Sequence, residues 1–207
     1  MSNFLLSILI PYTEDRIEEF GSLSNEFRRQ IGFYNLNSDI EVISDGRGKE
    51  IPIGQKRNDL YNESNGLYSV MWDSDDWINP YGLELIYSKL SDRKLDAVGY
   101  KEYCLINGVE FSSNISNEYD DWEGDGTTIF SDGFNYHRTI FFKTPILTEL
   151  CRMVGVDEKS RFGEDHDFAR RLKPHLKNVG YIDEYIYRYI HYSKPEDHNK
   201  RYGIDRG

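Results

Sequence analysis

The sequence has few cysteines, no long hydrophobic run and a shortage of positive charge. Its 207 residues include two cysteines, Cys104 and Cys151, which are too few for a disulfide scaffold or a cysteine-based metal site. No apolar run approaches the roughly 20 residues that a membrane-spanning helix requires. Acidic residues outnumber basic ones by 36 to 25, for a formal net charge of −11, which disfavours a broad nucleic-acid-binding face. Together these features favour a cytoplasmic protein.

Enough hydrophobic residues are present for a packed core. They make up 38% of the chain, and aromatic residues make up 14%, so wholesale disorder is excluded. Strand-like apolar segments alternate with helix-like segments whose apolar residues recur every three or four positions. The strand-like segments span residues 4–10, 40–44, 67–72 and 95–100, and the helix-like segments span 16–30, 54–65 and 80–90. This alternation predicts a single α/β domain with a mostly parallel central sheet flanked by helices.

Polar clusters follow three of the predicted strands. Residues 12–16 follow the first strand, Asp45 ends the second, and Asp73, Asp75 and Asp76 follow the third. In parallel α/β sheets, ligands bind beyond the carboxyl ends of the strands. The sequence therefore predicts a binding site at this edge of the sheet.

The acidic cluster Asp73-Ser74-Asp75-Asp76 indicates a divalent cation. Three carboxylates within four residues repel one another unless they share a cation, and Mg²⁺ or Mn²⁺ prefers oxygen ligands and keeps open positions for phosphate. The alternative interpretation is the solvated start of a helix, where the helix dipole favours aspartate.

Two further clusters suggest what such a site would do. Lys56 and Arg57 lie at the start of a predicted helix, where positive charge opposes the helix dipole unless an anion such as a diphosphate binds nearby. Glu164 and Asp165 follow a glycine, and such a carboxylate pair can provide a general base. The alternatives are a solvated basic helix face and an acidic helix N-cap. His191 is a weaker candidate for a metal or phosphate ligand, with a structural role as its alternative.

In this order the clusters resemble the GT-A nucleotide-sugar glycosyltransferases, specifically glycosyltransferase family 2 and its phage and bacterial subgroup. The resemblance extends from about Leu5 to Ser193. It implies a Rossmann-like GT-A fold in one domain, residues 1–207, with a nucleotide-sugar-binding half at about 1–100 and an acceptor-binding and catalytic-base half at about 101–207. The matching motifs are the first strand and its proline exit at 8–11, the basic-Arg-Asn element at 56–58, the D-x-D-type motif at 73–76 and the E-D motif at 164–165.

The resemblance also implies a role for each candidate residue. Asp165 would be the catalytic base, with Glu164 beside it, and Asp45 would recognise the nucleotide base. The implied ligands of a divalent cation, Mn²⁺ or Mg²⁺, are Asp73, Asp75, Asp76 and His191. The residues implied to bind the donor nucleotide are Pro11, Tyr12, Arg16, Asp45, Lys56, Arg57, Asn58 and Asp73.

The implied function is a metal-dependent, inverting transfer of a sugar from a nucleoside-diphosphate sugar, with UDP favoured, to a hydroxyl acceptor that the sequence does not identify. The location would be the cytoplasm, that of the host cell if the protein is phage-encoded. One alternative is a phage glycosyltransferase acting on hydroxylated DNA bases, with His137-Arg138 and Arg170-Arg171 as phosphate contacts, which the net charge disfavours. The others are a GT-A-like binding module without turnover, which the complete E-D motif disfavours, and a metal-dependent nucleotidyltransferase, which would not need that motif.

Overall fold

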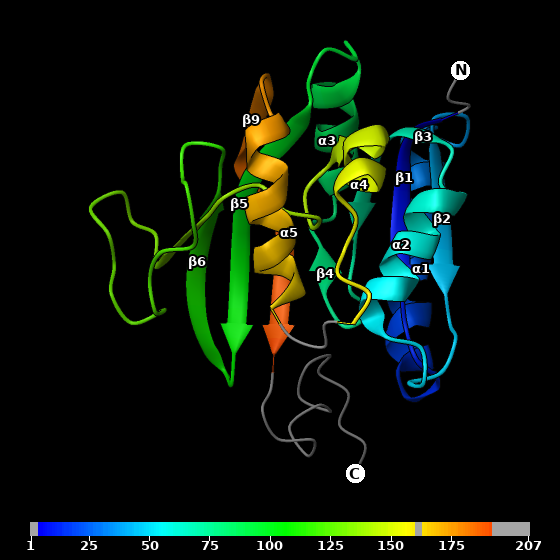
Figure 1. The fold of residues 1–207 in the computed structure, drawn as a ribbon, viewed down its shortest axis with the longest axis horizontal. Coiled ribbons are helices and arrows are strands. Elements are labelled where there is room, and N and C mark those ends of the chain that lie inside the picture. Colours follow the sequence, from blue (N-terminus) through cyan, green and yellow to red (C-terminus); the bar gives the residue numbers. More distant parts are fainter. Residues whose placement is uncertain (1–3, 160–162, 192–207) are drawn as a thin grey trace.

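The computed structural model describes residues 4–159 and 163–191, and one mixed sheet forms its centre. The strands follow the order β2-β1-β3-β8-β5-β6-β7, and β9 pairs with both β5 and β4. Figure 1 shows the sheet extending across the molecule, from β2 on the right to β6 on the left. The bounds are β1 Phe4–Pro11, β2 Ile40–Asp45, β3 Gly66–Met71, β4 Trp77–Ile78, β5 Ala97–Ile106, β6 Val109–Ile115, β7 Tyr136–Arg138, β8 Ile146–Leu147 and β9 Val179–His191.

Strands β1, β2 and β3 form the parallel part of the sheet. β1 lies between the other two, with Leu9 opposite Ile43 on β2 and Met71 on β3. All of β1 after its first residue is buried, which explains why Ser7 is the single polar residue in its sequence, because both faces of a parallel sheet are covered. Pro11 pairs with Asp45, so the residues that follow the three strands lie at the same edge.

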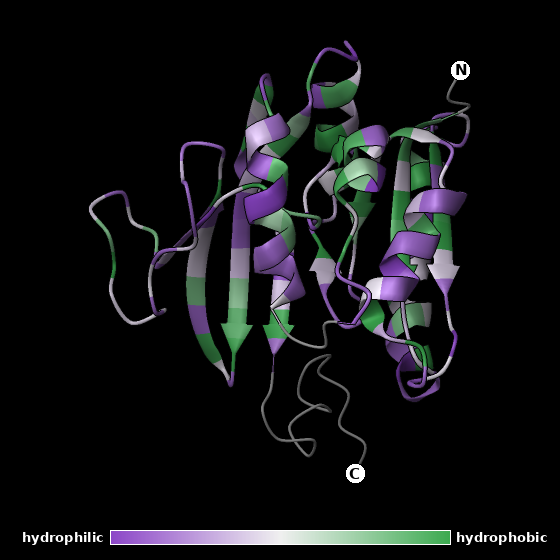
Figure 2. Ribbon diagram, viewed as in Figure 1, coloured by the Kyte–Doolittle hydropathy of each residue, from purple (hydrophilic) through white to green (hydrophobic). Residues whose placement is uncertain are grey.

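Helices cover both faces of this sheet. In Figure 1, α2, α4 and α5 lie in front of it, where α2 contacts α4 and α4 contacts α5, while α1 contacts α3. Figure 2 shows hydrophilic residues on the outward sides of α2 and α5 and hydrophobic residues in β1 and β3. The predicted α/β class with flanking helices is therefore confirmed. The bounds are α1 Ile17–Phe33, α2 Ile53–Glu63, α3 Gly82–Leu90, α4 Thr148–Val154 and α5 Glu164–Leu172, with short 3₁₀ helices at Glu14–Arg16 and Lys173–His175.

The second half of the chain is more antiparallel than the alternating pattern predicted. β5 pairs antiparallel with β6 and β8 and parallel with β9, and β4 pairs antiparallel with β9. β5 and β6 form a hairpin at Asn107 and Gly108, whose φ values of 52° and 82° suit an Asn-Gly turn. The strand predicted over 95–100 thus extends to Ile106. Within the described ranges, no helix is both long and apolar enough to cross a membrane.

Candidate functional site

A pocket of about 440 Å³ opens at the carboxyl end of β1, beside the start of α2. Its walls come from the ends of β1 and β3 and from the first turns of α2 and α5. Seven residues that the sequence predicted for the site line it, namely Pro11, Tyr12, Arg16, Lys56, Arg57, Asp73 and Glu164. The parallel strands and the two helices thus bring together side chains that lie up to 153 positions apart, from Pro11 to Glu164.

The pocket is more basic than the rest of the chain. Four cationic side chains line it, against three acidic ones, whereas the whole chain carries a formal charge of −11. Pro52 and Ile53, at the start of α2, also line the pocket, so the positive end of that helix dipole faces it. Helix N-termini and cations together favour a bound anion. The cationic residues are Arg16, Lys49, Lys56 and Arg57, and the acidic ones are Asp15, Asp73 and Glu164.

Tyr12 forms one wall of the pocket. Its ring stacks on Phe20, with ring centres 4.0 Å apart and planes 4° from parallel. Gly46 also lies against Tyr12, and a Cβ atom added there would lie 2.4 Å from the ring. Glycine at position 46 therefore lets the turn after β2 approach the aromatic wall.

Lys56 is buried and ties the loops around the pocket together. Its Nζ donates to the Tyr12 carbonyl at 2.9 Å and to the Arg47 carbonyl. Burial lowers the pKa of Lys56, against the attraction of Asp45. The ammonium thus connects the loop after β1 to the loop after β2.

Arg57 links both acidic motifs. Its side chain pairs with Glu164 and, at 3.2 Å, with Asp73, and its guanidinium lies 4.1 Å from the centre of the Phe142 ring. Although burial opposes it, the negative charges of Asp73 and Glu164 raise the pKa of Arg57. The Nε atom is buried with no hydrogen-bond partner within the described part of the chain. Arg57 therefore positions two carboxylates and keeps one N–H unused in the pocket wall.

A lysine that the sequence analysis did not predict, Lys143, lies against the acidic motif. Nζ of Lys143 lies 2.7 Å from Oδ2 of Asp73 and 2.9 Å from Oδ2 of Asp76. Burial opposes the ionisation of Asp73, but Lys143 and Arg57 outweigh it and lower the pKa of Asp73. A lone lysine after the apolar run at 140–142 was the available signal for a buried ion pair.

Asp76, a predicted metal ligand, is held within the fold at both of its carboxylate oxygens. Its side chain accepts hydrogen bonds from Lys143, the Tyr187 hydroxyl and, at 2.9 Å, the backbone N–H of Ile190. Burial, together with the negative charges of Asp75 and Asp73, raises the pKa of Asp76 to about 7. With 1% of the residue exposed and both oxygens engaged, Asp76 joins β9 to the end of β3.

The predicted four-residue metal site is not assembled in the described part of the chain, where no group of three or more His, Cys, Asp and Glu side chains is placed to hold an ion. Lys143 engages Asp73 as well as Asp76, and His191 is exposed at the end of β9. Asp75 differs, because its ion pair at 2.8 Å is with the half-exposed Arg16. One carboxylate combined with substrate phosphates is an arrangement that Mg²⁺ accepts, so Asp75 fits that type of site.

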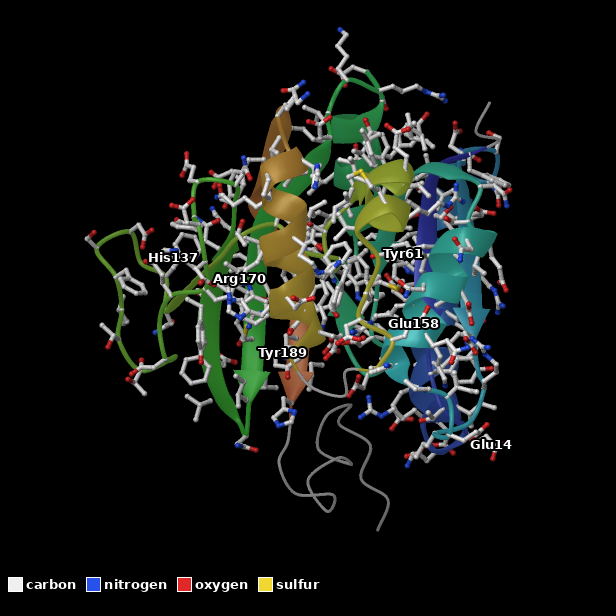
Figure 3. The ribbon with its side chains drawn as sticks, viewed as in Figure 1. Glu14, Tyr61, His137, Glu158, Arg170 and Tyr189 are labelled. Carbon is white, nitrogen blue, oxygen red and sulfur yellow. The ribbon has the colours of Figure 1, made fainter. Side chains whose placement is uncertain are left out.

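Two predicted donor-binding residues lie outside the pocket lining. Both oxygens of Asp45 bind Arg47, at 2.9 Å to Nε and 3.0 Å to the backbone N, because the turn folds that arginine back onto the strand end. Asn58 exchanges hydrogen bonds with the backbone of Val156, at 2.9 and 2.7 Å, and donates to Glu158. Figure 3 shows Glu158 beside α2. Asn58 thus holds the segment before α5 against α2.

The candidate base Asp165 lies in the first turn of α5, after Gly163, whose φ of 74° favours glycine. Its Oδ1 accepts the backbone N–H of His166 at 2.9 Å. The side chain is half-buried and does not line the 440 Å³ pocket, although its neighbour Glu164 does. His166 itself pairs with Asp121, which connects α5 to the segment between β6 and β7. Figure 3 shows Tyr189 of β9 near the start of this helix.

Comparison with solved structures identifies the fold. The structure superposes on S. aureus TarS with a TM-score of 0.61 and 14% identity, covering 96% of this chain and 38% of that one. It matches residues 1–349 of TarS in complex with UDP-GlcNAc (TM-score 0.60, 16% identity) over 96% of this chain and 64% of that one. The complex of TarS 1–349 with UDP gives a TM-score of 0.61 at 15% identity, covering 97% of this chain and 64% of that one.

These matches define the class of fold as GT-A, as the sequence predicted. The chain spans less than two thirds of the length of the TarS chains that it matches. No family model matches the sequence, and no curated protein is similar enough to match it.

Proposed function

We propose that the protein is a glycosyltransferase that uses a nucleoside-diphosphate sugar, with UDP as the favoured nucleotide, and transfers the sugar to a hydroxyl acceptor. The basic pocket at the carboxyl end of β1 carries this proposal, because it unites six of the eight donor residues that the sequence predicted. The similarity to TarS, whose structures include complexes with UDP and UDP-GlcNAc, supports it.

The pocket residues suggest how the donor would bind. The nucleotide would lie against Tyr12, and its diphosphate would lie near the start of α2, close to Arg16 and Arg57. Both arginines line this part of the pocket and would supply charge-assisted hydrogen bonds to the diphosphate. A divalent cation, Mn²⁺ or Mg²⁺, would be held by Asp75 together with the diphosphate oxygens. When bound, it would neutralise negative charge on the leaving group.

Asp165 is the proposed general base of an inverting displacement. The acceptor oxygen forms a bond with the anomeric carbon of the sugar from the face opposite the diphosphate. The bond from that carbon to the diphosphate oxygen breaks, and the diphosphate leaves with the electron pair. The proton of the attacking hydroxyl passes to the Asp165 carboxylate. Glu164 and Arg57 hold the start of α5 against the pocket, so that the base lies beside the donor site.

A donor-turnover assay tests this function. The purified protein is incubated with UDP-GlcNAc and other UDP-sugars, with and without candidate acceptors, and released UDP is measured in Mn²⁺ and in EDTA. We expect UDP release that is faster in Mn²⁺, and we expect Asp75→Asn to remove that difference. NMR of the product would show an inverted anomeric configuration. A folded protein that binds UDP but releases none from any nucleotide sugar would instead be a binding module.

A further inference from the structure

We propose that Lys143 is a positioning residue that acts as a built-in cation within the acidic motif. Its ammonium holds the Asp73 and Asp76 carboxylates together and fixes how Asp73 faces the donor pocket. The proposal rests on the proposed function for the identity of the donor, but the contacts of Lys143 do not depend on it.

The surroundings of the Lys143 ammonium replace its water shell. Nζ lies 2.7 Å from Asp73 and 2.9 Å from Asp76, and 4.9 Å from the ring centres of both Tyr187 and Tyr189. Only 5% of Lys143 is exposed. A buried ammonium is tolerated when carboxylates and aromatic faces replace solvent in this way.

The backbone around Lys143 is fixed to the end of β3. The Phe142 carbonyl accepts the backbone N–H of Met71 at 2.8 Å, and the backbone N–H of Thr144 donates to the Phe141 carbonyl at 2.9 Å. The Lys143 carbonyl accepts the hydroxyl of Tyr100. These hydrogen bonds on both sides of position 143 set the direction in which its side chain leaves the chain.

Lys143 is also part of a row of alternating charges. The row runs from Glu164 through Arg57, Asp73 and Lys143 to Asp76. Asp73 lies in the pocket wall, with Oδ1 held by Arg57 and Oδ2 by Lys143. The orientation of this carboxylate toward a donor therefore depends on both cations.

Removing the Lys143 charge would leave the Asp73 and Asp76 carboxylates without the cation that they share. A hard divalent ion binds oxygen ligands of this kind. The natural protein and a variant without the ammonium should therefore differ in how they bind Mn²⁺ before any nucleotide is present.

The test compares Lys143→Met, which keeps a long side chain without charge, with the natural protein and with Lys101→Met. Lys101 is a suitable control because it is also a lysine in an ion pair, with Asp183 at 2.6 Å, and it does not line the pocket. Bound Mn²⁺ is counted by electron paramagnetic resonance on nucleotide-free protein, and UDP affinity is measured by calorimetry.

We expect Lys143→Met to bind one Mn²⁺ without nucleotide, at a concentration at which the natural protein and Lys101→Met bind none. Its affinity for UDP should fall by about tenfold, the usual effect of disturbing a charge-assisted contact. Unchanged Mn²⁺ binding and unchanged UDP affinity in a folded Lys143→Met protein would overturn the proposal and leave a lysine that only supports the fold. Absence of UDP binding by the natural protein would count against the proposed function instead, and the Mn²⁺ result would still decide the role of Lys143.

If Lys143→Met does not fold, the double variant Lys143→Met/Asp76→Asn removes the uncompensated charge and keeps the test valid. It lacks one of the two carboxylates, so it should bind no Mn²⁺ without nucleotide and should still bind UDP more weakly than the natural protein. UDP affinity equal to that of Asp76→Asn alone would contradict a positioning role for Lys143.

Discussion

The two halves of the chain contribute to the pocket in different ways. In the first half, three parallel strands end at one edge of the sheet, so the residues that follow them meet there. In the second half, single groups arrive from separate elements, such as Lys143 from an irregular segment and Glu164 from α5. The first half thus provides most of the pocket lining. The second half provides Lys143, whose positive charge lowers the pKa of Asp73.

The largest expected effect tests the connection between the halves. Arg57→Met removes the cation that joins Glu164 to Asp73 and leaves both carboxylates without it. Breaking a buried pair by removing one partner costs about 3–5 kcal/mol, so urea unfolding should show a loss of that size. Arg29→Met, which removes the pair between a half-exposed arginine and Glu26, should cost much less. Equal losses in the two variants would show that the two halves are not coupled through Arg57.

A second prediction separates chemistry in the second half from donor binding in the first. Asp165→Asn keeps the shape of the side chain but removes the base, so turnover should fall by about a hundredfold or more. UDP affinity should stay within about twofold, an energy difference of about 0.4 kcal/mol. Asp167→Asn, one position from His166 and paired with Arg171, is the matched control and should retain turnover. Near-normal turnover in Asp165→Asn would move the base to another carboxylate.

The sequence predicted the first half better than the second for a physical reason. Alternating apolar and polar segments reveal where parallel strands end, so Tyr12, Arg16 and Asp73 could be placed in one pocket before the structure was known. The same patterns do not show which side chain a buried charge pairs with. The ion pairs of Lys143 with Asp73 and Asp76, and the contact between Arg47 and Asp45, could therefore be found only in the structure.

A third prediction concerns the Asp45 carboxylate, which Arg47 engages. Asp45→Asn should weaken UDP binding by less than about threefold, because Arg47 already engages both oxygens and the side chain lies outside the pocket lining. Asp73→Asn, in the lining, should weaken it by about tenfold or more. Calorimetric titration of both variants with UDP decides between them. A larger loss from Asp45→Asn would mean that Arg47 releases this carboxylate when the nucleotide binds.

The smallest expected effect is a dependence of stability on pH. Lys143 and Arg57 hold the pKa of Asp73 below its ordinary value despite burial. A group with a lowered pKa stabilises the folded state above its ordinary pKa, near 4, and this contribution is lost as the pH falls below that value. The free energy of unfolding should therefore drop more steeply between about pH 4 and pH 2.5 in the natural protein than in Asp73→Asn. Parallel slopes in urea titrations would contradict this assignment.

The most direct test of the central claim is whether the pocket recognises a diphosphate. Uridine, UMP and UDP are titrated calorimetrically into the natural protein and into Arg16→Ala. This variant lacks a guanidinium that lines the pocket of the natural protein. Affinity should rise from uridine to UMP to UDP, with about tenfold or more between the last two, as expected for an added charge-assisted contact. In Arg16→Ala this advantage of UDP should shrink. Equal affinities for uridine and UDP, unchanged by Arg16→Ala, would contradict a diphosphate-binding pocket at the end of β1.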